Sequence, residues 1–492
     1  MSELTAERRS YVAGSWVEGD TPFAVENPAD ESTITELPST PISEVERAIV
    51  GARSSFDAGV WADRSVKERA AVMHAFIDHV ESARAEIVAT CTAEAGQPTW
   101  FADMVQATGG VSFSRDTIEL YQGMSHEEIN SNIPVDELIR GGATLSVRRW
   151  EPVGVVAAIT PYNAALLMAL QKIIPALMAG NSVILRPSPL TPLSSLVLGA
   201  AAEAAGLPAG VFSVIVEGGA AGAELITTHP AVDMVSFTGS TTVGRQIAAQ
   251  GAPTLKHIAL ELGGKSAQIY LADAVERVAA GAAQVIAGSS GQACVAATRM
   301  LVPQELKADV LAIVAATFGA LPVGPPTTPG TMLGPVISAS QRARCERFVA
   351  LAEDNGGKVV VGGGRPANLE QGYYFEPTVL DVEDNSNPAA QEEIFGPVLT
   401  VIGYQDVDDA VRIANDSPYG LSGQVYSANV PAATAIARRI RSGAVGVNAG
   451  GLFSAYAPAG GYKQSGLGRE RGPEGVRSFQ ELKHLTIKDL PR

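Results

Sequence analysis

The chain has 492 residues, 46% of them hydrophobic and 18% charged, and this length exceeds one ordinary hydrophobic core, so we expect two or more domains. Lysine and arginine total 36 against 52 aspartate and glutamate residues, and the net charge of -16 disfavours nucleic acid and anionic membranes as partners. The 3 widely spaced cysteines give no disulfide framework and favour a reducing, cytoplasmic location.

The first half of the chain changes from helical to strand-like patterns. The start, MSELTAERRS, lacks an apolar h-region, so we expect no signal peptide. Residues 43–106 carry apolar side chains at spacings of three and four, which predicts helices. Over 133–159, β-branched residues in partial alternation predict strands.

From about residue 150 to 270, short apolar strands alternate with helical stretches. This alternation predicts βαβ units, with a parallel sheet and helices on both faces. The strand segments are VGVVAAI, NSVILRP, FSVIV, VDMVSF and HIALEL. The apolar run AALLMALQKIIPALMAG is interrupted by Gln171, Lys172 and Pro175 and is shorter than the ~18–20 residues of a membrane helix. We therefore predict a buried helix there and no membrane partner.

A second α/β stretch follows, with a helix over 274–287 and an irregular, glycine-rich tail, APAGGYKQSGLGRERGPEG. Its strand segments are SAQIYLA, RMLVP, KVVVGG, PTVLDV, PVLTVIGY and GAVGVN. No low-complexity linker separates the two α/β stretches. We expect them to pack closely, with a cleft between them.

Four local patterns could carry chemistry, and each has an ordinary alternative. Cys294, in GSSGQACVAATRM, is either a small buried hydrophobe or a nucleophile on a turn. VSFTGSTTVGRQIAA reads as strand, turn and helix, whose N-terminus suits phosphate, but an ordinary cap by Ser240 or Thr241 explains it equally well. Asn163 is an N-cap or an oxyanion donor, and Glu261 is a solvent-facing strand end or a desolvated base.

Several enzyme classes are disfavoured by missing motifs. LELGGKS fails the Walker pattern because Ala259 stands where a glycine is required. The 6 histidines show no metal-ligand spacing, so we expect no metal. The chain also lacks a GxSxG elbow, which disfavours a serine hydrolase.

Seven motifs occur in order along nearly the whole chain, roughly residues 10 to 490. They are ITPYN, AGNSVILRPSPLTP, FTGSTTVG, LELGGKS, GQACVAATR, EEIFGPV and GGYKQSGLGRE. Together they resemble the successive signatures of the aldehyde dehydrogenase superfamily. The resemblance implies an α/β fold of two Rossmann-like domains with a small β oligomerisation element. It also implies NAD or NADP as cofactor, a small-molecule aldehyde as substrate, and a homodimer or homotetramer.

The resemblance implies a division of the chain into three parts. Residues 1–129 and 153–262 would form the NAD(P)-binding domain. Residues 263–462 would form the catalytic domain. Residues 130–152 and 463–492 would pair between subunits as the oligomerisation element.

The resemblance also assigns catalytic roles. Cys294 resembles the nucleophile that forms a thiohemiacetal and then a thioester. Asn163 and the backbone N–H of Cys294 would hold the oxyanion, and Glu261 would activate the hydrolytic water. Lys172 and Glu470 stand at positions implied to relay protons. Since Arg299 is the one basic neighbour in sequence, our working hypothesis is that Glu261 or nearby dipoles activate the thiol.

Binding residues are implied in the same way. The cofactor set is Ile159, Thr160, Arg186, Ser188, Gly219, Phe237, Gly239, Ser240, Val243, Leu262, Gly263, Glu393 and Phe395. Within it, Glu393 would hold the nicotinamide ribose and Phe395 would flank the ring. The substrate set is Ala164, Leu167, Met168, Gln171, Ala293, Val295, Phe453, Tyr456 and Ala459.

The chain departs from the family pattern at residues 186–189. Many members read KPSE where this chain reads RPSP. The family glutamate bonds the adenosine ribose hydroxyls, and Pro189 removes that carboxylate, whereas Arg186 offers a planar fork suited to phosphate. One hypothesis is therefore that NADP is used comparably to NAD. The alternative is that other residues replace the ribose contacts.

The predicted substrate tunnel also departs from the pattern. Ala164, Ala165 and Gln171 stand where many small-aldehyde enzymes have Phe, Pro and Trp, and Ala459 stands where phenylalanine is frequent. The lost volume predicts a bulky or extended aldehyde, aromatic or terpenoid-like. No anchor for a carboxylate or phosphate is visible beside Cys294, so semialdehyde acids are disfavoured.

Three alternatives remain open. A coenzyme A-acylating semialdehyde dehydrogenase is disfavoured because such members typically lack a glutamate at the position of Glu261. A non-catalytic structural protein on the same fold would be free to lose Cys294, Glu261 or Asn163, and all three are present. A thiol esterase would use Cys294 without forming NAD(P)H.

Overall fold

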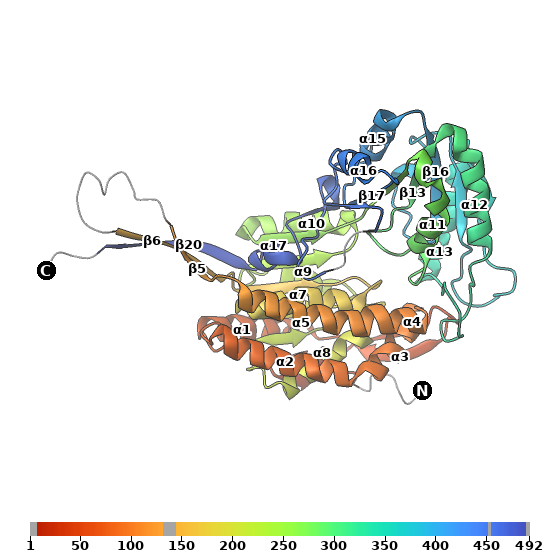
Figure 1. Cartoon of the computed structure of the whole chain (residues 1–492). Helices are drawn as coiled ribbons and strands as arrows, with labels where there is room; N and C mark the ends of the chain where they lie inside the picture. The colour runs from red at the N-terminus through yellow and green to blue at the C-terminus, as the bar shows by residue number, and fades with distance from the viewer. Residues whose placement is uncertain (1–6, 131–143, 451–453, 489–492) are drawn as a thin grey trace.

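The computed structural model describes residues 7–130, 144–450 and 454–488. Two α/β blocks, each built on its own sheet, lie side by side, and a pair of long strands projects from them (Figure 1). The predicted α/β class with two Rossmann-like domains is confirmed. The part of the predicted strand region at 133–143 falls outside the described residues.

The first sheet has eight strands in the order β19-β11-β10-β7-β8-β9-β1-β2. Its central five strands are parallel, as the βαβ alternation predicts, and β1, β2 and β19 add antiparallel edges. The bounds are β1 Ser10–Val12, β2 Ser15–Val17, β7 Val155–Ile159, β8 Ser182–Arg186, β9 Phe212–Val214, β10 Met234–Thr238, β11 His257–Glu261 and β19 Gly466–Leu467.

Helices cover both faces of this sheet because its strands are apolar on both sides. Along β7, Val156 and Ala158 join one core cluster, and Val155 and Ala157 join another on the opposite face. The helical elements of this block are α1 Ile42–Asp57, α2 Val66–Ser82, α3 Arg84–Ala95, α4 Thr99–Phe101, η1 Ala102–Gly109, α5 Gly110–Gly123, α7 Ala165–Ala179, α8 Leu193–Ala204, α9 Ala221–Thr228, α10 Thr241–Gly251 and η2 Ala252–Thr254.

The apolar helix α7 is buried along nearly its whole length, because it packs between α5, α8 and strand β7. Gln171 and Lys172 are buried in it, and Pro175 lies inside it. Among the described residues, no helix combines the length and apolarity needed to cross a bilayer.

The second sheet has seven strands in the order β14-β15-β16-β13-β12-β17-β18. All are parallel to their neighbours except β14, which is antiparallel to β15. The strand bounds are β12 Ala267–Tyr270, β13 Arg299–Pro303, β14 Lys358–Val361, β15 Thr378–Asp381, β16 Val398–Tyr404, β17 Ser422–Tyr426 and β18 Ala444–Val447. The helical elements are η3 Ala272–Arg277, α11 Val278–Ile286, η4 Gln304–Leu306, α12 Lys307–Gly319, α13 Ala339–Asp354, α14 Pro388–Gln391, α15 Val407–Asn415 and α16 Val430–Ala437.

Strand β17 was not predicted, although it lies inside the second sheet between β12 and β18. Its sequence, SGQVY, begins with residues of low strand propensity. Pairing on both sides, at Gly423 with Ala267 and with Val445, holds it extended. Tertiary pairing therefore decides this strand. The N-terminal strands β1 and β2 and the hairpin of β3 Pro22–Glu26 with β4 Thr33–Pro38 were likewise not predicted.

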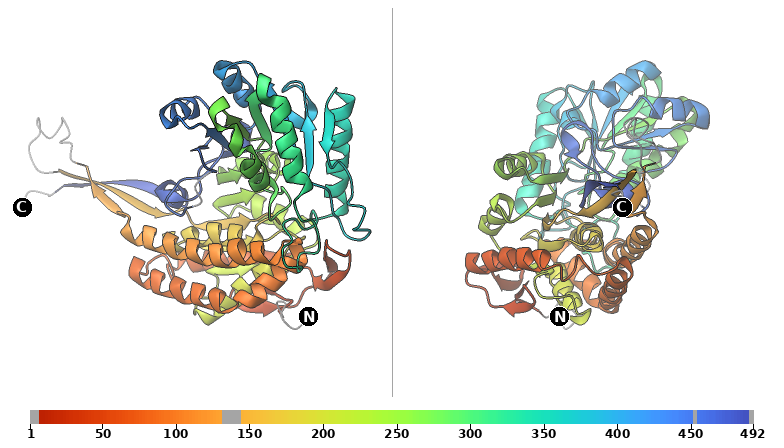
Figure 2. Two further views of the ribbon diagram at one scale, coloured as in Figure 1. Left: turned by 45° about the vertical axis from the view of Figure 1, so that its right-hand side comes forward. Right: turned by 90° about the vertical axis from the view of Figure 1, so that its left-hand side faces the viewer.

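The projecting element pairs two distant parts of the chain. Strand β6 Thr144–Pro152 runs antiparallel to β20 Gln480–Lys488 over nine residue pairs, and β5 Glu127–Ile129 adds to the other edge of β6 (Figures 1 and 2). The tail that leads to β20 was predicted to be irregular. It instead contains η5 Lys463–Ser465, β19 and α17 Gly472–Arg477.

Candidate active site

A cavity of about 800 Å³ lies along the carboxyl ends of β7, β8, β10 and β11 and reaches the second block at Cys294 and Glu393. Ligands of open α/β sheets bind at this edge of a parallel sheet. The volume lies within the range of ligand pockets, about 300–1,000 Å³. The cavity therefore suits a ligand that spans both blocks.

Cys294 lies on the loop between α11 and β13, and its side chain is half-buried. Backbone φ values of +51° at Ser290 and +71° at Gly291 form a tight turn just before it. A β-carbon at Gly291 would overlap the carbonyl oxygen of Gly396, so only glycine fits there. Cys294 lines the cavity, whereas Cys91 and Cys345 are buried cysteines.

The electrostatic surroundings of Cys294 raise its pKa to about 12, mainly because the thiol is desolvated, and Glu393 and Glu261 raise it further. Arg471 is the cation that lowers it. Arg299 points elsewhere: its Nε donates to the carbonyl of Lys265 at 2.8 Å. Sequence analysis considered Arg299 and missed Arg471, although Arg471 directly follows Glu470.

Asn163 is held beside the cysteine loop. Its Nδ2 donates to the carbonyl of Gln292 at 2.7 Å, and its own carbonyl accepts from Gln97 Nε2 at 2.6 Å. The N-cap of α7 is Ala164, without a side-chain cap bond, so Asn163 does not act as the cap. The amide nitrogen has a second N–H, which is available to an oxygen near Cys294.

Glu261 ends β11 and lines the cavity. Burial and repulsion by Glu470 raise its pKa to about 8, while Lys172 and Arg471 act in the opposite direction. Its Oε1 is buried without a hydrogen-bond partner among the described residues. The solvent-facing alternative is thus not observed, and the position fits a base that is largely protonated at neutral pH.

Lys172 and Glu470 form a buried ion pair whose side chains are 1% and 8% exposed. Lys172 Nζ also lies 3.1 Å from Ser236 Oγ. Neither residue lines the cavity, but both act electrostatically on Glu261, which does. The pair therefore influences Glu261 from outside the cavity.

Twelve of the thirteen residues predicted to bind the cofactor line the cavity: Ile159, Thr160, Arg186, Ser188, Phe237, Gly239, Ser240, Val243, Leu262, Gly263, Glu393 and Phe395. Ser240 is both a cavity residue and a helix cap, the two alternatives that its motif left open. It lines the cavity, and its hydroxyl accepts from the N–H of Val243 at 3.3 Å and so caps α10. Gly219 is the exception, and its carbonyl accepts from Arg186 Nη2 at 2.6 Å.

Glu393 and Phe395 are fixed by their neighbours. Glu393 accepts from the N–H of Gly264 at 2.9 Å, and burial raises its pKa to about 7. Phe395 has a φ of +62°, and Gln341 Nε2 donates to its carbonyl at 2.7 Å. Its ring meets the edge of Tyr162 at 5.9 Å between centroids.

None of the predicted substrate residues lines this cavity. Leu167 and Gln171 are buried, Val295 and Tyr456 are exposed, and Ala164, Met168, Ala293 and Ala459 lie between these extremes. Phe453 falls outside the described residues. Arg471 contacts one of these predicted residues, because its Nη2 lies 3.4 Å from Gln171 Oε1. Its guanidinium lies 5.9 Å from the ring centre of Phe113.

Several other cavity residues were not among the predicted site residues. They are Pro161, Tyr162, Pro189, Ala220, Ala223, Glu224, Thr227, Thr238, Thr241, Thr242, Gln246, Ile247, Gln250, Gln341, Arg344, Glu392 and Tyr419. Pro161, Tyr162, Pro189, Thr238, Thr241, Thr242 and Glu392 nevertheless lie within the quoted motifs. Among the described residues, no group of His, Cys, Asp and Glu side chains is arranged to hold a metal ion.

An α/β fold whose cavity lies at the carboxyl ends of parallel strands and reaches a half-buried cysteine, an asparagine and a desolvated glutamate is the arrangement of a nucleotide-dependent enzyme. The sequence matches the model of the Aldehyde dehydrogenase family over residues 16–485, and the chain belongs to that family. It is an NAD(P)-dependent aldehyde dehydrogenase.

Similar proteins extend over the whole chain. A putative aldehyde dehydrogenase, DhaS, of Bacillus subtilis is 36% identical, covering 98% of this chain and 96% of the relative. Geranial dehydrogenase of Castellaniella defragrans is 38% identical, covering 97% and 98%. A mutant aldehyde dehydrogenase C of Pseudomonas syringae, solved with NAD+ and octanal, has a TM-score of 0.91 and 36% identity over 98% of this chain and 96% of that chain.

Proposed function

We propose that this enzyme oxidises an aldehyde to the free carboxylic acid through a covalent intermediate on Cys294. The observation that carries the proposal is that Cys294, Asn163 and Glu261 line the same cavity, with Asn163 bonded to the cysteine loop and Glu261 acting on the thiol. The cavity residues fit a dinucleotide, since the N-terminus of α10 offers its N–H groups and dipole to phosphates. When bound there, NAD(P) supplies the hydride acceptor.

In the first half of the reaction, Sγ of Cys294 attacks the aldehyde carbon and forms a carbon–sulfur bond. The developing oxyanion accepts hydrogen bonds from Nδ2 of Asn163 and the backbone N–H of Cys294. Collapse of this thiohemiacetal would transfer its hydride to bound NAD(P) as the acceptor, and a thioester would remain on Cys294. Because the thiol has a raised pKa, its proton must pass to solvent water as attack occurs, and Arg471 and the dipoles around it favour the thiolate.

In the second half, Glu261 takes a proton from water as the water oxygen attacks the thioester. The carbon–sulfur bond breaks, the carboxylate leaves and the cysteine is regenerated. The buried pair of Lys172 and Glu470 acts electrostatically on Glu261. We propose that this pair carries away from the site the proton that Glu261 has taken. We propose Cys294, Asn163 and Glu261 as catalytic residues on this basis.

Identifying the product tests this reaction. Incubation with aldehyde and NAD(P) is expected to yield free acid and NAD(P)H in equal amounts, without coenzyme A. Acyl-CoA as the main product in the presence of coenzyme A would support the acylating alternative instead. Cys294→Ala is expected to abolish NAD(P)H formation, and near-full turnover in this variant would refute the covalent mechanism.

The proposed substrate is a bulky or extended aldehyde. Support comes from the small side chains of Ala164 and Ala459 and from the amide of Gln171 in place of large rings. The relative named for geranial and the neighbour solved with octanal agree with this size. A panel of short, branched, aromatic and terpenoid aldehydes is expected to give its highest kcat/KM with a long or bulky member. Acetaldehyde as the best substrate would contradict the proposal.

The domain division is proposed as 1–129 with 153–262 for the cofactor, 263–462 for catalysis, and 130–152 with 463–492 for assembly. The separate sheets support the first two parts, and the projecting strands support a homodimer or homotetramer through the third. A cytoplasmic location is proposed because all three cysteines are free thiols. Cell fractionation tests the location.

A further inference from the structure

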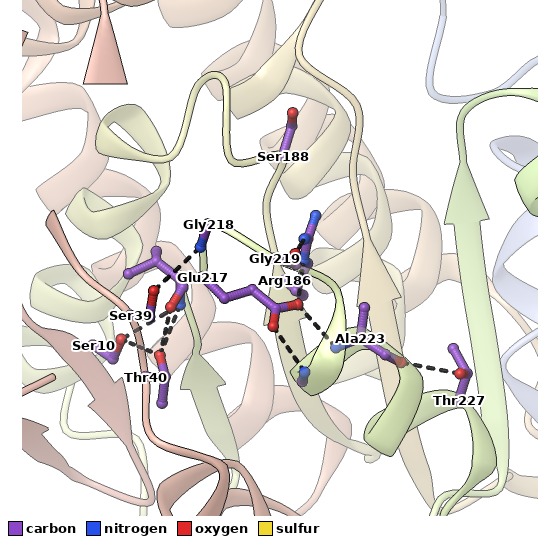
Figure 3. A network of polar contacts seen from close by, with 12 residues as sticks. Ser10, Ser39, Thr40, Arg186, Ser188, Glu217, Gly218, Gly219, Ala223 and Thr227 are labelled. Atoms are coloured by element: carbon purple, nitrogen blue, oxygen red, sulfur yellow. Dashed lines mark hydrogen bonds and ion pairs between the residues drawn. The ribbon is translucent and has the colours of Figure 1, made fainter. Parts of the chain in front are cut away.

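Arg186, which lines the cofactor cavity, forms a buried ion pair with Glu217 (Figure 3). Arg186 ends β8, and Glu217 lies three residues beyond β9, the neighbouring strand. Nε of the arginine donates to Oε1 of the glutamate at 3.0 Å, and the two side chains are 10% and 8% exposed. Sequence analysis identified the arginine and missed its partner.

Glu217 is held in place by the start of helix α9. Its Oε2 accepts from the N–H of Gly222 at 2.7 Å, and its Oε1 accepts from the N–H of Ala223 at 2.9 Å. These donors lie at the positive end of the helix dipole and favour a carboxylate there. The glutamate is therefore a fixed negative charge facing the guanidinium.

The pair lies where the adenosine end of the cofactor must be. Hydride transfer requires the nicotinamide to lie beside Cys294, close to the end of β11. Strands β10 and β7 separate β11 from β8, so Arg186 is about 14 Å along the sheet edge from Glu261, at a strand spacing of about 4.8 Å. The N-terminus of α10, suited to the pyrophosphate, follows β10 between them.

The pairing engages two of the five N–H donors of Arg186 and sets a negative charge against its positive one. Nε is bound to Glu217 and Nη2 donates to the carbonyl of Gly219, so among the described residues only Nη1 makes no hydrogen bond. One edge of the Arg186 guanidinium is thus occupied, and the negative charge of Glu217 offsets its positive charge. Glu224 adds another negative charge to the same cavity wall. A neutral ribose hydroxyl tolerates this environment, whereas a 2′-phosphate is repelled by it.

We propose that Glu217 is a specificity-determining residue that makes the enzyme prefer NAD to NADP by neutralising and immobilising Arg186. Isolated in the sequence, Arg186 suggested comparable use of both cofactors, and the fixed carboxylate reverses that expectation. The proposal rests on the use of NAD(P) alone and is independent of which aldehyde reacts or which product forms.

The test replaces Glu217 by glutamine, which keeps the size of the side chain and removes its charge. The wild type is expected to bind and use NAD better than NADP. In Glu217→Gln, the ratio of kcat/KM with NADP to that with NAD is expected to rise about tenfold or more, since hydrogen bonds to charged groups contribute about 1.5–3 kcal/mol. The matched control is Glu224→Gln, which removes a charge from the same helix and cavity without touching Arg186. It is expected to change the ratio less than about threefold.

Arg186→Gln and the double variant test whether the arginine transmits the effect. In the Arg186→Gln background, Glu217→Gln is expected to leave the ratio nearly unchanged. An equal rise in that background would show direct repulsion by Glu217 and overturn the proposal. A wild type that uses both cofactors equally, or an unchanged ratio in Glu217→Gln, would also overturn it.

Cofactor binding provides a readout without an aldehyde. Titrations of the folded proteins with NAD+ and NADP+, followed by calorimetry, are expected to show the same shift in the ratio of Kd values. If aldehyde oxidation failed in every assay, these titrations would still decide the proposal. Thermal unfolding of each variant verifies that a changed ratio does not come from a damaged fold.

Discussion

At the scale of single residues, the charges that face Cys294 decide when its thiol becomes a nucleophile. Burial and two carboxylates raise its pKa, and Arg471 is the cation that opposes them. The sequence supplied the cysteine, the amide and the glutamate as candidates because motifs mark them. It could not supply Arg471, because its approach to Cys294 depends on how the C-terminal tail folds back onto the first block.

Replacing Arg471 by leucine tests this view of the thiol. Loss of the cation is expected to raise the pKa of Cys294 further, so the thiolate fraction at a fixed pH falls and kcat/KM decreases. The rate of alkylation by iodoacetamide as a function of pH measures the same shift. Arg469→Leu is the control, since Arg469 acts on Glu261 and not on Cys294. An unchanged alkylation profile in the Arg471 variant would contradict the assignment.

Replacing Glu261 by glutamine tests the base. We expect a rapid burst of NAD(P)H, followed by turnover slower by about 100-fold, because acylation proceeds and hydrolysis loses its base. In the wild type, the pKa of about 8 predicts that the deacylation rate rises as pH increases through 8, because the carboxylate form is the base. Stopped-flow absorbance measures both phases. Equal slowing of burst and steady state would exclude a specific role in hydrolysis.

The raised pKa of Glu261 also predicts how the stability of the fold depends on pH. Its pKa is raised in the folded protein from 4.5 to about 8, so its protonated form stabilises the fold below about pH 4.5, and that stabilisation is lost as pH rises toward 8. In Glu261→Gln this pH dependence is expected to disappear. Urea unfolding at pH 5 and pH 9 measures it, and the variant is expected to gain stability relative to the wild type at pH 9. A constant difference at both values would contradict the raised pKa.

At the scale of elements, the loop between α11 and β13 positions the nucleophile through backbone geometry. The turn at Gly291 requires a positive φ and the close approach of Gly396, and both conditions exclude a side chain. The periodicity of apolar residues was enough to predict the parallel strands around this site. It was not enough for β17, whose position depends on pairing with β12 and β18.

Gly291→Ala is expected to displace this loop. We expect a loss of about 2 kcal/mol in the free energy of unfolding and a strong fall in kcat, because the added methyl group overlaps a backbone carbonyl. Gly330→Ala is the matched control: its φ is +87°, but no heavy atom lies within 4 Å of an added β-carbon. That variant is expected to lose about 1 kcal/mol and to keep its turnover. Denaturant unfolding and steady-state kinetics distinguish the two, and equal effects on kcat would contradict the close approach.

At the scale of the whole molecule, the projecting strands leave apolar side chains uncovered. Leu145 on β6 and Ile487 on β20 face each other in the register and are 40% and 51% exposed. Strand β20 also forms the edge of its sheet. An exposed edge with apolar side chains is a surface suited to pairing with another chain, and it supports the proposed assembly with a second copy.

Ile487→Lys is therefore expected to weaken the proposed assembly. Light scattering coupled to gel filtration is expected to give a dimer or tetramer for the wild type and a smaller species for the variant. Leu255→Lys, at an 88% exposed leucine on the body of the first block, is the control and is expected to leave the mass unchanged. A monomeric wild type would contradict the assembly.

The sequence by itself determined the class of fold and most of the parallel strands of both sheets, because apolar periodicity and glycine-rich turns act locally along the chain. It also determined which residues were candidates for covalent catalysis, since Cys294, Asn163 and Glu261 each stand in a motif. The tertiary structure alone decided their electrostatics. Arg299 turned away from Cys294 while Arg471 reached it, and Glu217 occupied Arg186. Such pairings join residues distant in the chain, and Coulomb interactions depend on separation in space and on burial rather than on sequence order.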